Sequence, residues 1–250
     1  MTEPTRQSRA QITLARALSK FGFASRSKAA VIIREGRVQV DGRVVRDPDR
    51  WLDPRTARIE VDGARLFAKE FRYLAMHKPS GYVTTHADER GRETVYALLP
   101  PGLPWMFPVG RLDKDSSGLL LFTNDVRWGE MISSPEHHIP KTYNVSVDRP
   151  LDERDLDVMR NGMTLDDGTV LLPVGVRRGP QGGSSVALTL TEGKNRQVRR
   201  MMEHFRYEVE TLVRTAIGPI TLKGLAVGEV RPVTSDERRL VGEFKMKEKK

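Results

Sequence analysis

One carboxylate of this chain stands where an active-site acid would be presented. Asp113 is flanked by Arg111 and Lys114, and a continuous apolar run at 119–122 follows it. Such a run predicts a strand covered on both faces, so the carboxylate would sit on a fixed loop. Cations on both sides would favour its ionised form. An ordinary glycine-rich turn with solvated charges fits the same segment equally well.

An arginine-rich helix is the second feature whose residues could take part in binding or catalysis. Apolar residues recur at helical spacing within 195–205 and would bury one face of a helix. Gly193 and Lys194 precede this helix, where free backbone N–H groups favour a phosphate or a carboxylate. A surface helix with solvated arginines is the plain alternative. The polar face would carry Arg196, Arg199, Arg200 and Glu203.

Three sequence words, taken together, resemble one enzyme family. The first, Gly110-Arg111-Leu112-Asp113, is similar to the catalytic motif shared by several pseudouridine synthase families, and its extension to Asn124 narrows the match. The second word is Lys141-Thr-Tyr143 at the start of a strand, and the third, at 192–201, opens a helix. Their order resembles the family of the ribosomal small subunit pseudouridine synthase A and its large-subunit relatives, over about residues 12 to 240.

This resemblance implies a role for each matching residue. Asp113 would be the catalytic aspartate, Tyr143 would stack on the target base, and Arg199 would pair with Asp113 and keep it ionised. Tyr143 could equally be a strand aromatic that packs inward. The sequence contains no nucleotide-binding or metal-binding motif with the required spacing, so no nucleotide or metal cofactor is expected. The residues that would support the site are Arg111, Lys141 and Gln197.

The reaction explains why so few residues are needed. Uridine becomes pseudouridine when the C1′–N1 bond breaks and C1′ joins C5 of the same base, without water, an energy source or a redox change. One carboxylate can therefore be sufficient where a glycoside hydrolase commonly uses two. Asp113 would either attack C1′ or remove the 2′ proton, and the sequence does not choose between these routes. The target base must be flipped out of a helix or be unpaired already.

Positive charge is concentrated at the start of the chain. Residues 1–46 hold ten Lys/Arg against three Asp/Glu, a net of +7. A short helix from about Leu14, a second helix capped by Ser25, and a hairpin turning at Asp41-Gly42 resemble the S4 RNA-binding module. Its cations would grip phosphates, although a solvated surface is the alternative. These cations are Arg16, Lys20, Arg26, Lys28, Arg34 and Arg37.

A strand that begins at Tyr73 leads into the larger part of the chain. It is expected to end at Lys78, because Pro79 and Gly81 force a turn. His77 stands where the family commonly has Asn, and we interpret it as structural.

The expected fold is α+β, with a small α/β S4-like domain at 9–68 and a larger pseudouridine synthase domain at 69–243 built on a mainly antiparallel mixed sheet. The ends, 1–8 and 244–250, are expected to be a disordered tail and a basic tail. The larger domain has candidate strands at 73–77, 118–123, 142–148, 186–191 and 208–214, and candidate helices at 126–133, 152–160 and 195–205.

The composition limits the class of protein, its cellular compartment and its partners. The 250 residues are 38% hydrophobic and contain no run long enough to span a membrane, no signal-peptide core and no cysteine. We therefore expect a cytoplasmic monomer. The formal charge of +9 favours a polyanionic partner. His137 and His138 have no further ligands at metal-binding spacing, so no metal site is expected.

These observations favour isomerisation of a specific uridine in ribosomal RNA, either free or in a partly assembled subunit. A non-catalytic RNA-binding assembly factor is the alternative, and the presence of Asp113, Tyr143 and Arg199 together disfavours it. The segments at 107–109, 114–116 and 203–209 resemble the large-subunit members slightly more, so 23S-type RNA is preferred over 16S-type RNA.

Overall fold

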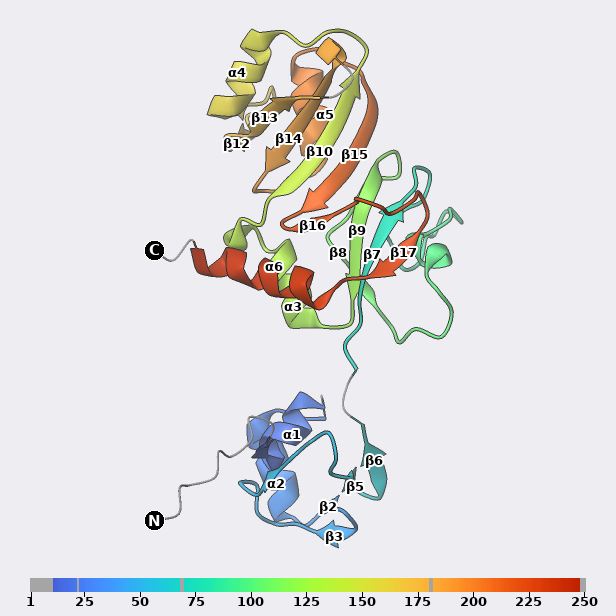
Figure 1. Ribbon diagram of the computed structural model, residues 1–250, viewed down its shortest axis with the longest axis vertical. Coiled ribbons are helices and arrows are strands. Elements are labelled where there is room, and N and C mark those ends of the chain that lie inside the picture. Colours follow the sequence, from blue (N-terminus) through green and yellow to red (C-terminus); the bar gives the residue numbers. More distant parts are fainter. Residues whose placement is uncertain (1–10, 22, 68–69, 180–181, 248–250) are drawn as a thin grey trace. The chain divides into compact units, whose positions relative to one another are not determined.

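The computed structural model describes residues 11–21, 23–67, 70–179 and 182–247 (Figure 1). The chain divides into two compact units, Met1–Glu70 and Phe71–Lys250, called here the N-terminal and C-terminal units. The expected tail at 1–8 lies outside the described residues.

The N-terminal unit packs two helices beside a small antiparallel sheet. Thr13 caps the first helix and Ser25 caps the second, each through its side-chain oxygen. The hairpin turn falls at Asp41-Gly42, where both residues have positive φ, 51° and 77°. Both helices and this hairpin confirm the sequence-based expectation. The elements are β1 (Ile12–Thr13), α1 (Leu14–Lys20), α2 (Arg26–Arg34), β2 (Val38–Val40), β3 (Arg43–Val44), β4 (Trp51–Leu52), β5 (Ile59–Val61) and β6 (Ala64–Leu66), with sheet orders β1-β4 and β3-β2-β5-β6.

The C-terminal unit is built on one mixed sheet in the order β13-β14-β10-β15-β9-β7-β17. All its pairings among the described residues are antiparallel except β9 with β15, which is parallel over two residue pairs. The fold class expected from the sequence is confirmed. The strands are β7 (Tyr73–Lys78), β8 (Phe107–Val109), β9 (Ser117–Thr123), β10 (Lys141–Val147), β13 (Gly175–Arg178), β14 (Ser185–Leu190), β15 (Val209–Ile217), β16 (Ile220–Thr221) and β17 (Val230–Pro232).

Helices cover parts of this sheet, and a separate hairpin adds to one side. These elements are α3 (Val126–Ser133), α4 (Glu153–Asn161), α5 (Gln197–His204), α6 (Ser235–Lys247) and the hairpin of β11 (Met163–Thr164) and β12 (Val170–Leu171). Short 3₁₀ turns lie at Val95–Leu98, Pro135–His137 and Gly182–Ser184.

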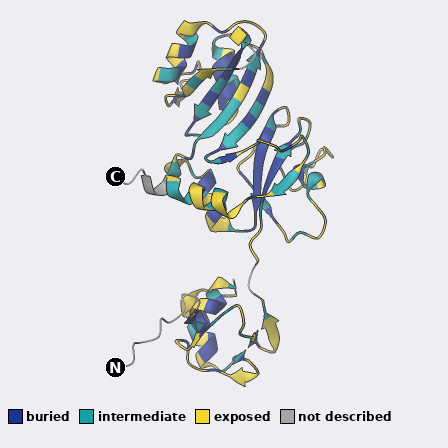
Figure 2. Ribbon diagram, viewed as in Figure 1, coloured by how far each residue is buried: buried dark blue, intermediate teal, exposed yellow. Residues whose placement is uncertain are grey.

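Strand β9 separates two hydrophobic clusters of the C-terminal unit, and it is mostly dark blue in Figure 2. Leu119 and Leu121 enter a cluster with Trp128 and Ile132. Leu120 and Phe122 enter a different cluster, on the opposite face of the strand. The expectation of a strand covered on both faces is therefore confirmed, and the loop that precedes it is held at a fixed place.

Several boundaries differ from the sequence-based expectation, most of them by one residue, and β15 continues to Ile217 instead of ending at 214. Two helices differ in ways that matter for the site or the core. Helix α5 begins at Gln197 instead of 195, because Arg196 adopts a left-handed conformation with φ 48°. Helix α6 continues to Lys247, whereas we expected residues 244–250 to form a tail without regular structure. Val241 of this helix is fully buried and packs into the core, which accounts for the helix being ordered against the sheet.

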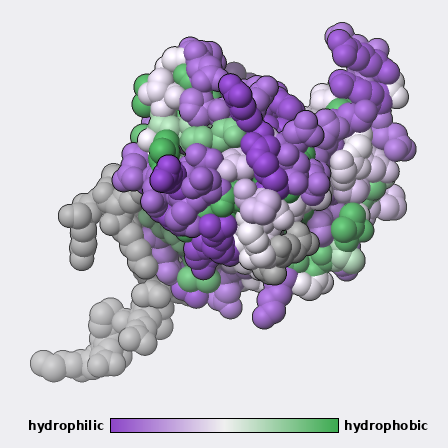
Figure 3. All heavy atoms as spheres, turned by 90° about the horizontal axis from the view of Figure 1, so that it is seen from above, coloured by the Kyte–Doolittle hydropathy of each residue, from purple (hydrophilic) through white to green (hydrophobic). Residues whose placement is uncertain are grey.

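Hydrophilic side chains cover most of the face seen in Figure 3, which agrees with the 30% of residues that are charged. In the described part of the chain, no helix has the length and apolar character that crossing a membrane requires.

Candidate active site

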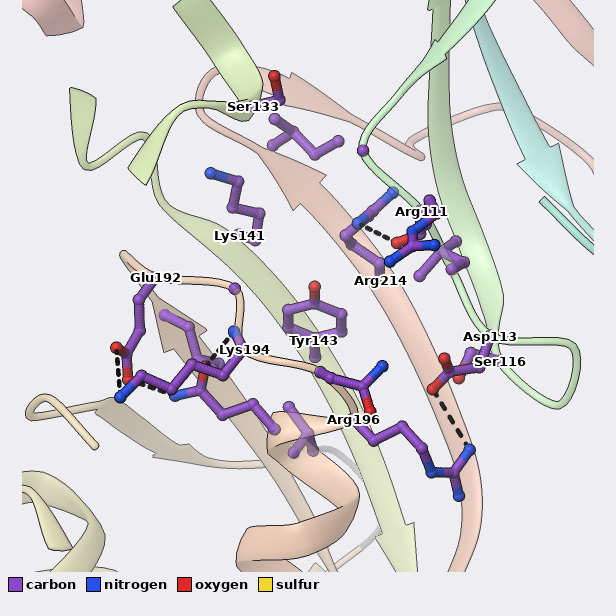
Figure 4. Close-up of a pocket in the computed structure, with 18 of the residues that line it drawn as sticks. Arg111, Asp113, Ser116, Ser133, Lys141, Tyr143, Glu192, Lys194, Arg196 and Arg214 are labelled. Atoms are coloured by element: carbon purple, nitrogen blue, oxygen red, sulfur yellow. Dashed lines mark hydrogen bonds and ion pairs between the residues drawn. The ribbon is translucent and has the colours of Figure 1, made fainter. Parts of the chain in front are cut away.

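A pocket of about 330 Å³ opens in the C-terminal unit (Figure 4). Its floor is the sheet, and its walls are the loop before β9, the end of α3 and the segment before α5. Asp113 and Tyr143 both line it, so two of the three residues expected to be catalytic meet in one cavity. In Figure 4, Tyr143 stands in the middle, with Asp113 and Arg196 on one side and Lys141 on the other.

Sheet register explains which side chains reach the floor. Lys141 and Tyr143 are two residues apart on β10, so their side chains lie on the same face of the sheet, and both line the pocket. Tyr143 is paired with Arg214 of β15 and with Leu188 of β14. Arg214 also lines the pocket, so a tyrosine and two cations project from neighbouring positions.

The loop that carries Asp113 is fixed by Lys78, a residue that the sequence analysis placed only at a turn. The side chain of Lys78 is fully buried at the end of β7, opposite Gly118 of β9. Burial lowers its pKa from 10.5 to about 8, and the nearby Asp113 and Asp115 carboxylates partly oppose this change. Its Nζ lies near four backbone carbonyl oxygens, those of Ser116 at 2.6 Å, Asp113 at 3.0 Å, Pro79 at 3.1 Å and Lys114 at 3.3 Å.

Asp113 is partly exposed to the pocket, with 33% of its side chain accessible. The cation beside it is Arg196, whose Nη1 lies 3.5 Å from Asp113 Oδ2. Arg196 immediately precedes α5, and its left-handed backbone conformation ends the loop there. This ion pair would orient the carboxylate.

The expected contact between Arg199 and Asp113 is not the one found. Arg199 lies in the first turn of α5, and its Nη2 donates to the backbone carbonyl of Asp115 at 2.9 Å. It does not line the pocket. The sequence-based pairing was therefore wrong in its partner: Arg199 contacts the backbone of the Asp113 loop, and Arg196 contacts the carboxylate.

Arg214 is a site residue that the sequence analysis missed. Only 4% of it is exposed, and its Nε donates to the carbonyl of Leu119 at 2.8 Å and its Nη1 to that of Arg111 at 3.3 Å. A Cβ on Gly118 would lie 2.3 Å from the carbonyl oxygen of Arg214, so glycine permits this approach of β9 to β15. The sequence offered one signal for it, a single charged residue within the mostly apolar segment 212–217.

The three residues expected to support the site differ in their exposure and in their hydrogen bonds. Arg111 lines the pocket and is exposed, while its backbone carbonyl accepts from Arg214. Lys141 donates to the carbonyl of Ile132 at 3.2 Å, and burial, followed by the charge of Arg214, lowers its pKa to about 8. Gln197 is buried and shapes the wall: its Nε2 donates to Glu192 at 2.7 Å and its Oε1 accepts from the backbone N–H of Lys194 at 3.1 Å.

All six cations expected to bind RNA in the N-terminal unit are exposed, but they differ in whether a carboxylate holds them. Arg37 differs, because it forms ion pairs with Asp62 at 2.6 Å and Glu35 at 3.2 Å, and these partners raise its pKa. His77, interpreted as structural, has its Nδ1 3.0 Å from the carbonyl oxygen of Leu225. Among the residues that the structure describes, no group of three or more His, Cys, Asp or Glu could hold a metal ion.

Two family models match the chain. The RNA pseudouridylate synthase model covers residues 72–204, and the S4 domain model covers residues 13–54. The first match includes all three sequence words and most of the pocket described above. The second falls within the N-terminal unit.

Curated relatives and a solved structure agree with these models. An RNA pseudouridine synthase of Mycobacterium tuberculosis is 39% identical over 231 residues, which cover 90% of this chain and 91% of that protein. The ribosomal large subunit pseudouridine synthase B of Bacillus subtilis is 34% identical over 230 residues, covering 90% and 93%. A crystal structure of a pseudouridylate synthase superposes with a TM-score of 0.65 at 28% identity, covering 92% of this chain and 99% of that one. The chain therefore belongs to the RNA pseudouridine synthase family and carries an S4 domain ahead of its synthase domain.

Proposed function

We propose that this protein converts one specific uridine of ribosomal RNA to pseudouridine, with 23S-type RNA as the substrate. The observation that carries the proposal is the meeting of Asp113 and Tyr143 in one pocket, with Arg196 holding the carboxylate. The choice of 23S-type RNA is supported by the similarity to the Bacillus subtilis enzyme, whose name specifies the large ribosomal subunit.

Asp113 is the catalytic aspartate of this proposal. Its carboxylate acts at the ribose, either by attacking C1′ or by removing the 2′ proton. Arg196 forms an ion pair with this carboxylate and orients it. Lys78 and Arg199 act on the backbone of the same loop, and they keep the carboxylate at a constant position while the substrate changes.

Tyr143 holds the target base in this proposal. The ring stands in the middle of the pocket, where a base flipped out of its stack can lie against it. Stacking would retain the base after the C1′–N1 bond breaks, and it would permit the rotation that brings C5 to C1′. The volume of the pocket, about 330 Å³, lies within the range of small-ligand sites.

The N-terminal unit supplies affinity for RNA. Exposed Arg16, Lys20, Arg26, Lys28 and Arg34 form the surface that we propose for phosphate contacts. Arg37 contributes less, because its guanidinium is held by Asp62 and Glu35. Such contacts position the enzyme, and the structure of the RNA around the uridine selects the target.

Mapping pseudouridines in ribosomal RNA tests the proposal. Cells that lack this protein should lose one or a few pseudouridines in 23S-type RNA. Expression of the wild-type protein should restore them, and expression of Asp113→Asn should not. An unchanged map in both ribosomal RNAs would contradict the proposed function. If Asp113→Asn repaired a ribosome-assembly defect without restoring any pseudouridine, the assembly-factor alternative would be favoured.

A further inference from the structure

Arg214 is a buried cation whose hydrogen-bonding capacity is not fully used. Two of its nitrogens donate to the backbone carbonyls of Leu119 and Arg111. Its Nη2 is also buried, yet it has no hydrogen-bond partner among the residues that the structure describes. A buried donor without an acceptor is unfavourable and uncommon in folded proteins. Because Arg214 lines the pocket, a bound molecule could supply the missing acceptor.

A second cation, Lys141, lines the same pocket. Its Nζ donates to the carbonyl of Ile132, which leaves two of the three ammonium protons for other acceptors. The lowered pKa of Lys141 reports its burial and its repulsion by Arg214. In the described part of the chain, neither cation forms an ion pair with a carboxylate, and Asp113 is held by Arg196 instead. This part of the pocket therefore carries unbalanced positive charge.

The proposed reaction, on which this inference rests, produces an anion at this place. When the C1′–N1 bond breaks, its electron pair stays with the base, and the negative charge spreads to O2 and O4 of the uracil ring. Asp113 meets the electron deficiency at the ribose. C5 then forms the bond to C1′, the proton on C5 is lost, and N1 gains a proton, so the product is an isomer of the substrate and no co-reactant is consumed.

We propose that Arg214, assisted by Lys141, binds the oxygens of the detached uracil anion, which makes Arg214 a further catalytic residue. Arg214 is the register partner of Tyr143 on the adjacent strand, so its guanidinium projects beside the ring that stacks on the base. A phosphate of the RNA backbone would have the same charge. The base is favoured over the phosphate because both cations are at the floor of the pocket and Arg214 is almost completely buried.

Arg214 could instead serve only to clamp the loop, since two of its donors bind backbone carbonyls there. Leaving-group basicity separates these roles. Fluorine at C5 withdraws electrons and makes the uracil anion less basic, so cleavage of the C1′–N1 bond then depends less on a nearby cation. The experiment compares single-turnover cleavage of this bond in target RNA that contains uridine or 5-fluorouridine, for the full-length wild type and Arg214→Met. Lys223→Met, which removes an exposed cation outside the pocket, is the matched control.

Removal of the cation should slow cleavage on uridine by about 10²- to 10³-fold, as removal of an oxyanion-stabilising donor does. The loss should be at least about tenfold smaller on 5-fluorouridine, because less charge stabilisation is needed. Lys223→Met should show the same small change on both substrates. Equal losses on the two substrates for Arg214→Met would show that Arg214 acts only on the loop, and they would overturn the proposal.

A binding measurement does not depend on turnover. Barbiturate is a planar anion with the shape of uracil, and wild-type protein should bind it more tightly than neutral uracil. Arg214→Met should lose this preference, whereas Asp113→Asn and Lys223→Met should keep it. The proposal would be overturned if the wild-type protein did not prefer barbiturate to uracil. It would also be overturned if the protein bound inorganic phosphate through Arg214 and did not bind barbiturate. A retained preference in a protein that forms no pseudouridine would reject the proposed function and leave the anion subsite standing.

Discussion

Replacing Lys78 with methionine should loosen the Asp113 loop and destabilise the C-terminal unit. An ammonium can bond three of the four neighbouring carbonyls at once, and each hydrogen bond to a charged group contributes about 1.5–3 kcal/mol. Burial of the charge, which lowers the pKa of Lys78 from 10.5 to about 8, offsets about 3 kcal/mol of this gain. The free energy of unfolding should therefore fall by about 1–6 kcal/mol, with about 3 kcal/mol as the central value.

The catalytic effect of Lys78→Met should be larger than its effect on folding. A displacement of about 1 Å at a reacting group can reduce a rate by about 10²-fold, and Lys78 contacts the carbonyl of Asp113 itself. Urea unfolding of the full-length variant and single-turnover isomerisation on a target RNA fragment would measure the two effects. Lys114→Met is the matched control, because it removes an exposed cation from the same loop, and its unfolding free energy should change by less than about 0.5 kcal/mol.

The dependence on pH gives a further check of Lys78. Its pKa is lower in the folded state than in the unfolded chain, so between pH 8 and 10.5 the unfolded state binds more protons. The Lys78 contribution to the free energy of unfolding should therefore rise with pH across this window, and Lys78→Met should lack that rise. Lys141 titrates near the same pH and contributes to both proteins. The reasoning about this lysine would be refuted if Lys78→Met unfolded at the wild-type urea concentration with the wild-type pH profile and isomerised RNA at the wild-type rate.

Further substitutions test the rest of the candidate site and the N-terminal cations. Asp113→Asn should reduce the single-turnover rate by roughly 10⁴-fold while RNA affinity is kept, and a variant with a tenth of normal activity would contradict its assignment. Tyr143→Phe should keep substrate affinity and Tyr143→Ala should lose it, and equal losses would argue against stacking. Neutralising Arg16, Lys20, Arg26 and Lys28 together should flatten the salt dependence of RNA binding, by at most about 0.7–0.9 of a log unit for each phosphate that the protein no longer neutralises. Arg37→Gln should change this slope less, because Arg37 is already paired, and binding isotherms across a salt series would compare the variants.

Two kinds of feature could be predicted from the sequence: elements with a clear hydrophobic pattern, and motifs that occupy short continuous segments. The apolar run of β9 and the helices of the N-terminal unit are of the first kind, and Asp113 and Tyr143 are of the second. The roles of Lys78 and Arg214 could not be predicted from the sequence. Each is a single cation in a largely apolar strand, and the carbonyl groups that accept its hydrogen bonds belong to distant parts of the chain. The contact of Arg196, instead of Arg199, with Asp113 could not be predicted either. It depends on the left-handed backbone conformation of Arg196 just before α5, which helical periodicity does not reveal.

The parallel pairing of β9 with β15 has a consequence for how this protein acquires activity. It joins two groups of strands through only two residue pairs, Ser117 with Val213 and Gly118 with Arg214. Asp113 belongs to the group that contains β7 and β9, and Tyr143 belongs to the group that contains β10, β14 and β15 (Figure 1). Bringing these groups together requires contacts between residues about a hundred positions apart, which form late because long loops must close first. If the proposed function is correct, the N-terminal unit of a partly folded chain would therefore be able to bind RNA before the pocket that contains Asp113 and Tyr143 has formed.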